Sequence, residues 1–258
     1  MRNKGLVTIL GIVFLFLFQN ISIYGQDTTK RHYLEISTSF VEHKDQVDYG
    51  LVFRGPVLLL KYEFHKKTEK HFLKFESELG FGASWARGIA AFNYKFKPIQ
   101  LEYYLPIKFK NTTLFLGAYS SLNYEYDDNP WLHSGRTYWF STIDFGPAIY
   151  FETNIKSKQL AVNVNSSLFS FVSRPEYVPE DYFYDISFLD VLKNMNSDFS
   201  FATINKRYSF EVEIWLLNFT KRAWSVAYSF NYSAYYNEPK TTYLTNKIIF
   251  RKQLGRKK

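Results

Sequence analysis

The sequence predicts an all-β protein, an antiparallel up-and-down β-barrel of about ten strands that spans a membrane. Three observations predict it. Aromatic residues make up 20% of the chain, with 26 Phe and 21 Tyr, and a membrane barrel places such side chains on its wall and at both lipid–water boundaries. Apolar and polar residues alternate with period two through most of the chain. Turn-rich breaks of alternating length separate the alternating segments.

The alternation is clearest in residues 223–236. The even positions from Trp224 to Tyr232 are large and mostly apolar, and the odd positions from Ala223 to Ser233 are small or polar. A strand with these two faces separates lipid from a polar lumen. We therefore expect the apolar face of each strand to point outward.

Ten segments carry this pattern, and an even number is typical of single-chain bacterial barrels. They are 34–40, 56–64, 73–81, 99–105, 114–122, 143–151, 160–168, 208–216, 223–236 and 243–254. Short breaks are expected at 65–70, 109–111, 154–158 and 218–221, longer ones at 43–54, 86–96, 127–136 and 173–206, and a short one at 237–241. If the first strand starts at the periplasm, the long breaks face outward, as they do in outer-membrane barrels.

Residues 1–25 are predicted to be a cleaved secretory signal peptide. Arg2 and Lys4 precede the apolar run Leu6–Phe18, and Gly25 precedes the expected new N-terminus, Gln26. An uncleaved anchor is the alternative. The rest divides into a lead at 26–32, the barrel at 33–254 with its long outer loop 173–206, and a basic tail at 255–258.

Over residues 31–254 the chain resembles the bacterial outer-membrane β-barrel class in its signal, alternation, aromatic residues and loop asymmetry. The resemblance implies an outer-membrane location, a surrounding of membrane lipid and lipopolysaccharide, and a monomer. The chain departs from many members, whose last strand ends in an aromatic residue, because Phe250 is followed by Arg251–Lys258. A soluble periplasmic barrel or sandwich, with its apolar face inward, is the alternative fold.

The polar face predicts what fills the barrel. Toward the periplasmic end it gathers a lumen charge network of Lys61, Glu63, Lys74, Glu76, Glu78, Glu102, Glu152, Glu213, Lys247 and Arg251. Opposite charges in a narrow, partly dry tube should pair. Since a ten-stranded barrel is only slightly wider than an eight-stranded one, which side chains already fill, we expect a salt-bridged plug rather than an open channel.

Two further features concern the outer half and the wall. Small polar residues predict a hydrated cup that opens outward: Ser37, Ser39, Gly82, Ser84, Ser121, Asn123, Ser229 and Ser233. Aromatic belts are expected at the outer boundary (Trp85, Tyr124, Tyr126, Trp139, Tyr232, Tyr236, Tyr243) and the inner one (Tyr62, Phe64, Phe72, Tyr103, Phe151, Phe219, Trp224).

Charge and composition exclude several classes of function. The net charge of +8 is spread along the chain, so it favours anionic lipid head groups over nucleic acid. Without Cys there is no disulfide, thiolate metal site or Cys nucleophile. No His pair has convincing metal-ligand spacing, and no cofactor motif is present.

Catalysis is the least favoured of three functions. The layout is similar to that of the omptin proteases, which use Asp pairs and a His at the outer rim to activate water. Asp127, Asp128 and His133 share one expected loop, and Asp181 and Asp185 another, but 127–130 is also a good turn sequence. A Ser–His lipase site is weaker still, because His43 and His133 are expected in outer loops and no His lies beside a Ser within a strand.

The outer loops carry the preferred function. Segment 173–206 is long and rich in apolar residues, which argues for a packed lid or a surface for an envelope protein partner. The candidate outer surface comprises Trp131, Tyr177, Tyr182, Phe183, Tyr184, Phe188, Leu189 and Leu192. We expect a non-enzymatic scaffold, accessory or surface-interaction barrel; the alternatives are a small-solute channel or uptake barrel and, third, a rim-loop hydrolase.

Overall fold

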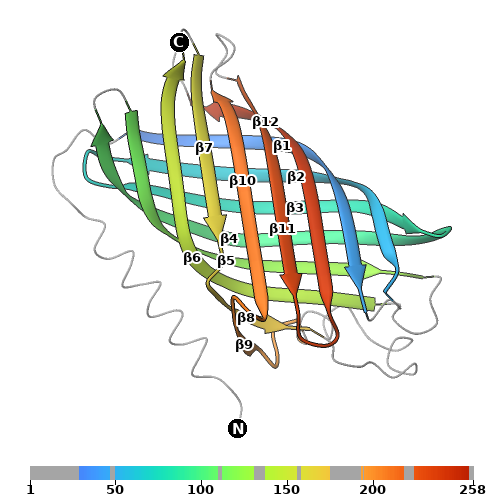
Figure 1. Cartoon of the computed structure of the whole chain (residues 1–258). Coiled ribbons are helices and arrows are strands. Elements are labelled where there is room, and N and C mark those ends of the chain that lie inside the picture. Colours follow the sequence, from blue (N-terminus) through green and yellow to red (C-terminus); the bar gives the residue numbers. More distant parts are fainter. Residues whose placement is uncertain are drawn as a thin grey trace.

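The computed structural model describes residues 29–46, 50–109, 112–130, 137–155, 158–174, 193, 195–217 and 224–255. Strands account for most of this part of the chain (Figure 1). They are β1 (Thr29–Asp45), β2 (Val52–Lys67), β3 (Phe72–Ala86), β4 (Ile89–Phe109), β5 (Thr112–Asp128), β6 (Thr137–Ile155), β7 (Lys158–Ser166), β8 (Phe169–Ser173), β9 (Ser200–Thr203), β10 (Arg207–Leu217), β11 (Trp224–Tyr235) and β12 (Thr241–Leu254).

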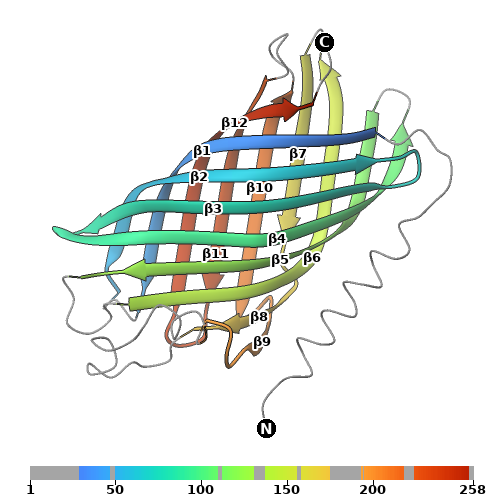
Figure 2. The same ribbon diagram turned by 180° about the vertical axis from the view of Figure 1, so that it is seen from behind.

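Ten of the strands form a closed ring. Neighbours pair antiparallel in the order β5, β4, β3, β2, β1, β12, β11, β10, β7, β6, and β6 pairs back to β5. From behind, β1–β6 cross one side of the barrel at a steep angle to β7 and β10–β12 on the other (Figure 2). The predicted antiparallel barrel of about ten strands is therefore confirmed. We call the end with Thr29 and Leu254 the inner end, and the end with Asp45 and Thr241 the outer end.

Two short strands extend the wall at the outer end. β8 pairs with β6 on one edge and with β9 on the other. β7 pairs with β10, whereas β8 pairs with β9. The ladder of backbone hydrogen bonds is interrupted between these two pairings, and Ser167 spans the interruption. The Ser167 amide donates to the Ser209 carbonyl at 2.8 Å, and the Ser167 hydroxyl accepts from the Ser209 amide at 2.8 Å. The backbone therefore stays hydrogen-bonded at a point where the strand pairing changes.

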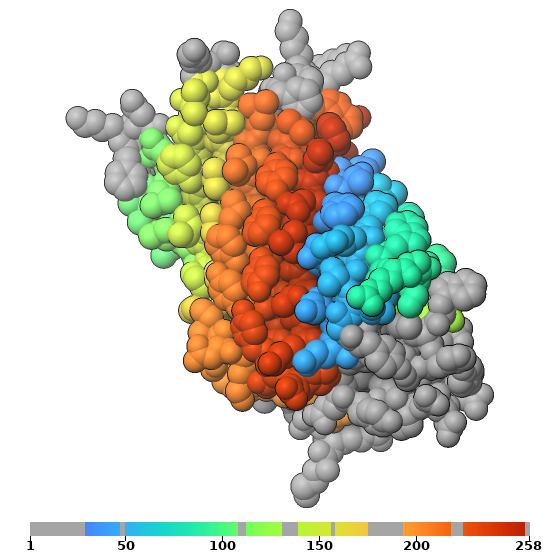
Figure 3. All heavy atoms as spheres, turned by 45° about the vertical axis from the view of Figure 1, so that its right-hand side comes forward, coloured from blue at the N-terminus to red at the C-terminus, as the bar shows by residue number. Residues whose placement is uncertain are grey.

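The wall is apolar outside and polar inside. On β2, Leu58 and Leu60 are 44% and 50% exposed, whereas the alternating Lys61 and Glu63 are 4% and 0% exposed. Outward residues of β1, β11 and β12, such as Ile36, Tyr228 and Ile248, are likewise exposed, and Figure 3 shows these strands side by side with β10 and β2. A closed barrel satisfies every ladder hydrogen bond within the wall, which is the condition for strands to cross hydrocarbon. The barrel therefore spans a membrane, as the alternation predicts.

Some aromatic residues lie inside rather than in the expected belts. Trp139 and Tyr243 are buried at the outer end, and Phe72 is buried at the inner end. All three fall on inward positions of their strands, so the belt prediction was wrong for them. Phe72 stacks on Tyr104. Both residues belong to a cluster of buried side chains, many of them aromatic, which we call the inner aromatic layer. Tyr62, Trp85 and Tyr103 are exposed on the wall, as expected for belt residues.

The expected loop at 86–96 is also wrong. β3 and β4 are joined by Arg87 and Gly88 alone, with φ of 49° and 86°. Positive φ at both central residues of a two-residue connection is the geometry whose twist matches the flanking strands. The alternation continues through β4 until a register shift between Phe96 and Ile99. The outer loop here is thus a tight hairpin.

Both ends of the chain lie largely outside the described residues. In the described residues, no helix has the length and apolarity needed to cross a membrane. The expected signal peptide at 1–25 lies outside the described residues, as does most of the basic tail. β1 begins at Thr29, inside the expected lead.

Candidate functional site: a charged plug in the lumen

All ten residues of the predicted lumen charge network are on strands of the ring, and nine are buried inside it; Glu152 lies at the inner rim. Glu63 and Lys61 come from β2, Lys74 and Glu76 from β3, Glu213 from β10 and Arg251 from β12. Because inward residues recur at every second position, each strand delivers these charges to the lumen side of the wall. We call the buried charges Glu35, Lys61, Glu63, Lys74, Glu76, Glu102, Glu213 and Arg251 the plug.

Lys61 is the first centre of the plug. Its Nζ lies 2.9 Å from Glu35 Oε2, 3.0 Å from Glu63 Oε1, 3.3 Å from Glu213 Oε1 and 3.6 Å from Glu76 Oε2. These carboxylates come from β1, β2, β10 and β3, so one ammonium group joins opposite walls. The Lys61 ammonium therefore links strands on facing sides of the ring.

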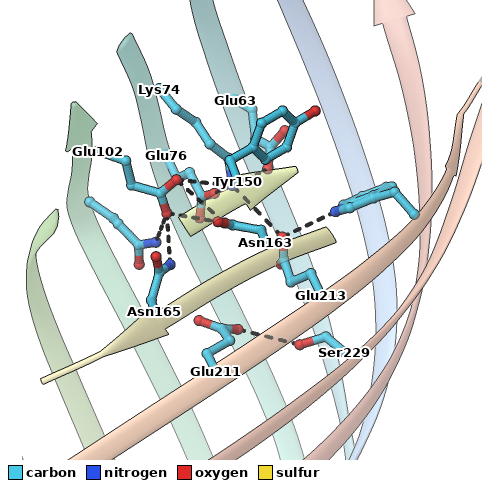
Figure 4. A network of polar contacts seen from close by, with 12 residues as sticks. Glu63, Lys74, Glu76, Glu102, Tyr150, Asn163, Asn165, Glu211, Glu213 and Ser229 are labelled. Carbon is cyan, nitrogen blue, oxygen red and sulfur yellow. Dashed lines mark hydrogen bonds and ion pairs between the residues drawn. The ribbon is translucent and has the colours of Figure 1, made fainter. Parts of the chain in front are cut away.

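Lys74 is the second centre. Its Nζ forms an ion pair with Glu76 and lies 3.6 Å from Glu102 Oε2, 3.7 Å from Glu63 Oε1 and 3.7 Å from Glu213 Oε2. Figure 4 shows these side chains converging from separate strands. The two lysines thus share three carboxylates, and loss of either leaves several negative charges facing one another.

Arg251 closes the plug at the inner end. Its Nη1 lies 2.9 Å from Glu63 Oε2 and 3.8 Å from Glu35 Oε1. Its guanidinium carbon lies 3.8 Å from the centre of the Trp215 ring and 4.4 Å from that of Tyr33. This arrangement combines ion pairing with cation–π contact, which planar guanidinium groups favour.

Hydrogen bonds saturate Glu102, the plug carboxylate nearest β7. It accepts from Gln100 Nε2 at 2.6 Å, from the Tyr104 hydroxyl at 2.7 Å and from Asn165 Nδ2 at 2.9 Å. Asn163 lies on the same side, and its Nδ2 donates to Glu102 at 3.4 Å. Neutral polar residues from β4 and β7 therefore compensate for the loss of water around this charge.

Three plug carboxylates could in principle hold a metal ion. Oxygen atoms of Glu63, Glu76 and Glu213 lie within 4.8 Å of one another. The ammonium groups of Lys61 and Lys74 contact all three residues, so they already supply the positive charge there. These residues do not fit a metal centre.

The remaining network residues lie above and below the plug. Lys247 Nζ is 3.4 Å from Glu78 Oε2 and 3.6 Å from Glu211 Oε1, nearer the outer end. Glu211 also accepts from the Ser229 hydroxyl at 3.4 Å (Figure 4). Glu152 lies at the inner rim, where it pairs with Lys67 at 2.7 Å. The network is therefore layered rather than a single cluster.

Above the plug lies a small polar cavity of about 80 Å³. Four of the residues expected in the outer cup line it: Ser39, Ser121, Asn123 and Ser233. Arg207 and Phe140 also line it, with the Arg207 guanidinium carbon 5.3 Å from the Phe140 ring centre. A space of this size holds a few water molecules.

A second polar layer crosses the outer end, and its centre is His43. This residue was expected in a loop but lies on β1 and is 1% exposed. Its Nδ1 is 3.1 Å from Asp127 Oδ2, its Nε2 is 3.9 Å from Asp45 Oδ2, and its ring stacks on Tyr243 with centres 4.1 Å apart. Arg174 Nη2 lies 3.1 Å from Asp45 Oδ1. We call His43, Asp45, Asp127 and Arg174 the outer latch.

Sequence reasoning missed Glu35 and the outer latch. Glu35 shares the inward face of Ser37 and Ser39, so its position two residues earlier was a usable signal. The latch joins β1, β5 and the end of β8, which no local pattern reveals. Asp127 was expected in a rim loop with Asp128; both end β5, and Asp127 accepts from Asn93 Nδ2 at 2.6 Å.

Several predicted residues cannot be placed. The candidate outer surface of Trp131, Tyr177, Tyr182, Phe183, Tyr184, Phe188, Leu189 and Leu192 lies outside the described residues. The same holds for His133, Asp181 and Asp185. The expected loop 173–206 contains β9 near its end.

The wall decides the class of protein. An even number of strands, an apolar outer face, short turns at the end that carries both chain ends, and a polar interior are together the features of bacterial membrane barrels. The chain is an outer-membrane β-barrel. It lies in the outer membrane, with membrane lipid against its apolar outer face.

Comparisons with known proteins add examples of this architecture. No family model and no curated protein matches the chain. Among solved structures, the translocator domain of the autotransporter NalP from Neisseria meningitidis has 7% identity and a TM-score of 0.43, covering 95% of each chain. The outer-membrane protease OmpT from Escherichia coli has 8% identity and a TM-score of 0.43, covering 90% of this chain and 99% of that chain. Neisserial surface protein A has 8% identity and a TM-score of 0.33, covering 84% and 95%. At such identities these matches transfer no function.

Proposed function

We propose that this outer-membrane β-barrel is a non-enzymatic, non-conducting protein that acts through its outer loops, as a scaffold, accessory component or surface-interaction protein. One observation carries the proposal. Lys61 and Lys74 bind carboxylates from β1, β2, β3, β4 and β10 in the middle of the lumen. An ion-pair network that joins opposite walls supports a lumen closed to solutes.

The pairing of each plug cation with several carboxylates supports closure as a stable state. Five plug carboxylates surround three permanent cations, and an aromatic layer that includes Phe72, Tyr104 and Trp215 covers the network on the inner side. Removing one partner of a buried pair is costly, whereas a complete network holds a single arrangement. Opening the lumen would require several such pairs to break together.

Recordings in planar lipid bilayers test the proposal. The folded barrel should give no conductance steps, whereas a variant with Lys74→Ala and Glu76→Ala, which removes one neutral pair from the plug, should give steps or a raised leak. Protease protection of the barrel in vesicles checks that both proteins insert equally. Regular conductance steps from the unaltered protein would contradict a closed lumen.

A small-solute channel or uptake barrel is the second candidate. It is favoured by the cavities that lie on both sides of the plug, about 80 Å³ above it and about 360 Å³ below it. This function predicts conductance in the unaltered protein, with ion selectivity changed by Glu78→Gln, because Glu78 lies between the plug and the upper cavity.

The outer loops and the oligomeric state belong to the same proposal. We propose a monomer whose segment 173–206 contacts an envelope partner. Analytical ultracentrifugation in density-matched detergent should give the mass of one chain. A barrel lacking residues 175–192 should fold normally and lose the surface interaction alone.

A further inference from the structure

The inner mouth of the barrel holds a recess that the proposed function does not use. It has a volume of about 360 Å³ and lies on the periplasmic side of the plug. Arg31, Lys67, Glu152, Tyr150, Phe72 and Arg251 are among the residues that line it. We call this recess the inner vestibule. Its volume falls within the usual range for small-molecule sites, roughly 300–1,000 Å³, whereas the upper cavity is too small for a solute.

The charges in the inner vestibule are unbalanced. Arg31 and Lys67 supply two positive charges against the single carboxylate of Glu152, because the charge of Arg251 is already paired with Glu63 and Glu35. That carboxylate is already bound to Lys67 Nζ at 2.7 Å and to the Tyr150 hydroxyl at 2.8 Å. The positive charge of Arg31 is thus left facing the recess. Low-dielectric walls around one sign of charge concentrate the opposite ion.

Arg251 supplies a second, independent observation. The residue is buried, and its Nη1 is engaged with Glu63. Its Nε, also buried, has no hydrogen-bond acceptor among the described residues. A buried donor without an acceptor costs free energy, and such a group calls for a bound molecule or water. Arg251 also lines the inner vestibule, which places this residue beside the recess.

The remaining lining suits an organic anion. Phe72 belongs to the aromatic layer that separates the inner vestibule from the plug, and Tyr150 stands beside it with ring centres 5.2 Å apart. A site with a few polar anchors over an apolar floor is the usual form of a small-molecule pocket. We propose that the inner vestibule binds the carboxylate or phosphate group of a small organic anion from the periplasm.

Arg31 is the residue to change, because it lies at the rim and outside the plug. The neighbouring Lys30 carries the same charge, but the alternation of β1 points it away from the lumen. Arg31→Gln and Lys30→Gln therefore remove equal charge from the two faces of one strand. Arg251→Lys keeps a charge opposite Glu63 and removes Nε, so it tests the buried donor.

The experiment is a calorimetric titration of the folded barrel in non-ionic detergent at constant ionic strength. The probes are phenylphosphate, benzoate and inorganic phosphate, which separate an organic phosphate, an organic carboxylate and the bare ion. We expect saturable binding of phenylphosphate or benzoate, tighter than that of inorganic phosphate. Arg31→Gln should raise the Kd at least fivefold, Arg251→Lys should also raise it, and Lys30→Gln should leave it within twofold.

Three results would overturn the proposal. They are the absence of saturable binding for all three probes, equal weakening by Arg31→Gln and Lys30→Gln, and binding of inorganic phosphate as tight as that of the organic anions. Folding of each variant is checked by its resistance to unfolding in cold dodecyl sulfate. If Arg251→Lys fails to fold, the comparison of Arg31 with Lys30 decides alone. Conductance is not measured, so this test is independent of whether the lumen is closed.

Discussion

Arg251 on β12 binds Glu63 on β2 at 2.9 Å, across the intervening strand β1. The pair therefore joins the last strand of the chain to the second strand of the ring. It lies beneath Trp215, whose ring centre is 3.8 Å from the Arg251 guanidinium carbon. This contact stabilises the junction between the first strand, β1, and the last strand, β12.

Replacement of Arg251 by Met should destabilise the barrel strongly. It leaves Glu63 and Glu35 buried with one cation fewer, and breaking a buried pair costs about 3–5 kcal/mol. The free energy of unfolding is measured by urea titration in lipid vesicles. Arg54→Met is the matched control, because Arg54 pairs with Glu42 on the outer surface, where a pair contributes about 0–1 kcal/mol. Equal losses in the two variants would contradict the role given to the plug.

The lipid-facing wall makes a depth-dependent prediction. Leu60 lies opposite Ile36 in the middle of the wall, and Leu254 lies at the inner end. Leu60→Arg should cost about 2–4 kcal/mol of unfolding free energy, and Leu254→Arg about 0–1 kcal/mol. Urea unfolding in vesicles of one lipid measures both. A larger loss at Leu254 than at Leu60 would be inconsistent with the assigned membrane depth.

Gly117 is required by close approach of two strands. A Cβ at this position would lie 2.0 Å from the Tyr103 carbonyl oxygen, so β4 and β5 would have to separate. Gly117→Ala should lower the unfolding free energy by about 1–3 kcal/mol or reduce the folded fraction. Its neighbour Ala118 faces outward, and Ala118→Ser serves as the control. Folded and unfolded bands in gel electrophoresis give the fractions, and an unchanged fraction for Gly117→Ala would argue against the close approach.

The outer latch predicts coupling between His43 and Asp127. Their side chains lie 3.1 Å apart and are both buried, and groups in one such network are coupled by about 0.5–3 kcal/mol. The measurement is a double-mutant cycle of His43→Ala and Asp127→Asn, followed by thermal unfolding. Additive losses would show that the two residues act separately.

The ring of strands could be predicted from the sequence because every strand repeats the same alternation of apolar and polar residues. Lipid outside and a narrow lumen inside force apolar and polar residues onto alternate positions, so Lys61, Glu63, Lys74 and Glu76 could be assigned to the lumen from their neighbours alone. The same rule covers Glu35, which shares the inward face of Ser37 and Ser39.

Other features were beyond a local pattern. The hairpin at Arg87 and Gly88 was expected to be a long loop, because the small residues before Phe92 obscured the alternation. Trp139 and Tyr243 were assigned to a belt by residue type, although their strand positions face inward. The outer latch depends on which strand ends become neighbours when the ring closes, and that information is held in the topology rather than in any one segment.

The seam between β1 and β12 has a consequence for biogenesis. These strands pair from His32 with Leu254 to Asp45 with Thr241, so the first segment to emerge must wait for the last before its backbone groups are satisfied. Until then the incomplete sheet has two unpaired edge strands and an apolar outer face, both of which favour self-association. A polypeptide truncated before residue 241 would lack β12, so β1 would keep an unpaired edge and the ring could not close.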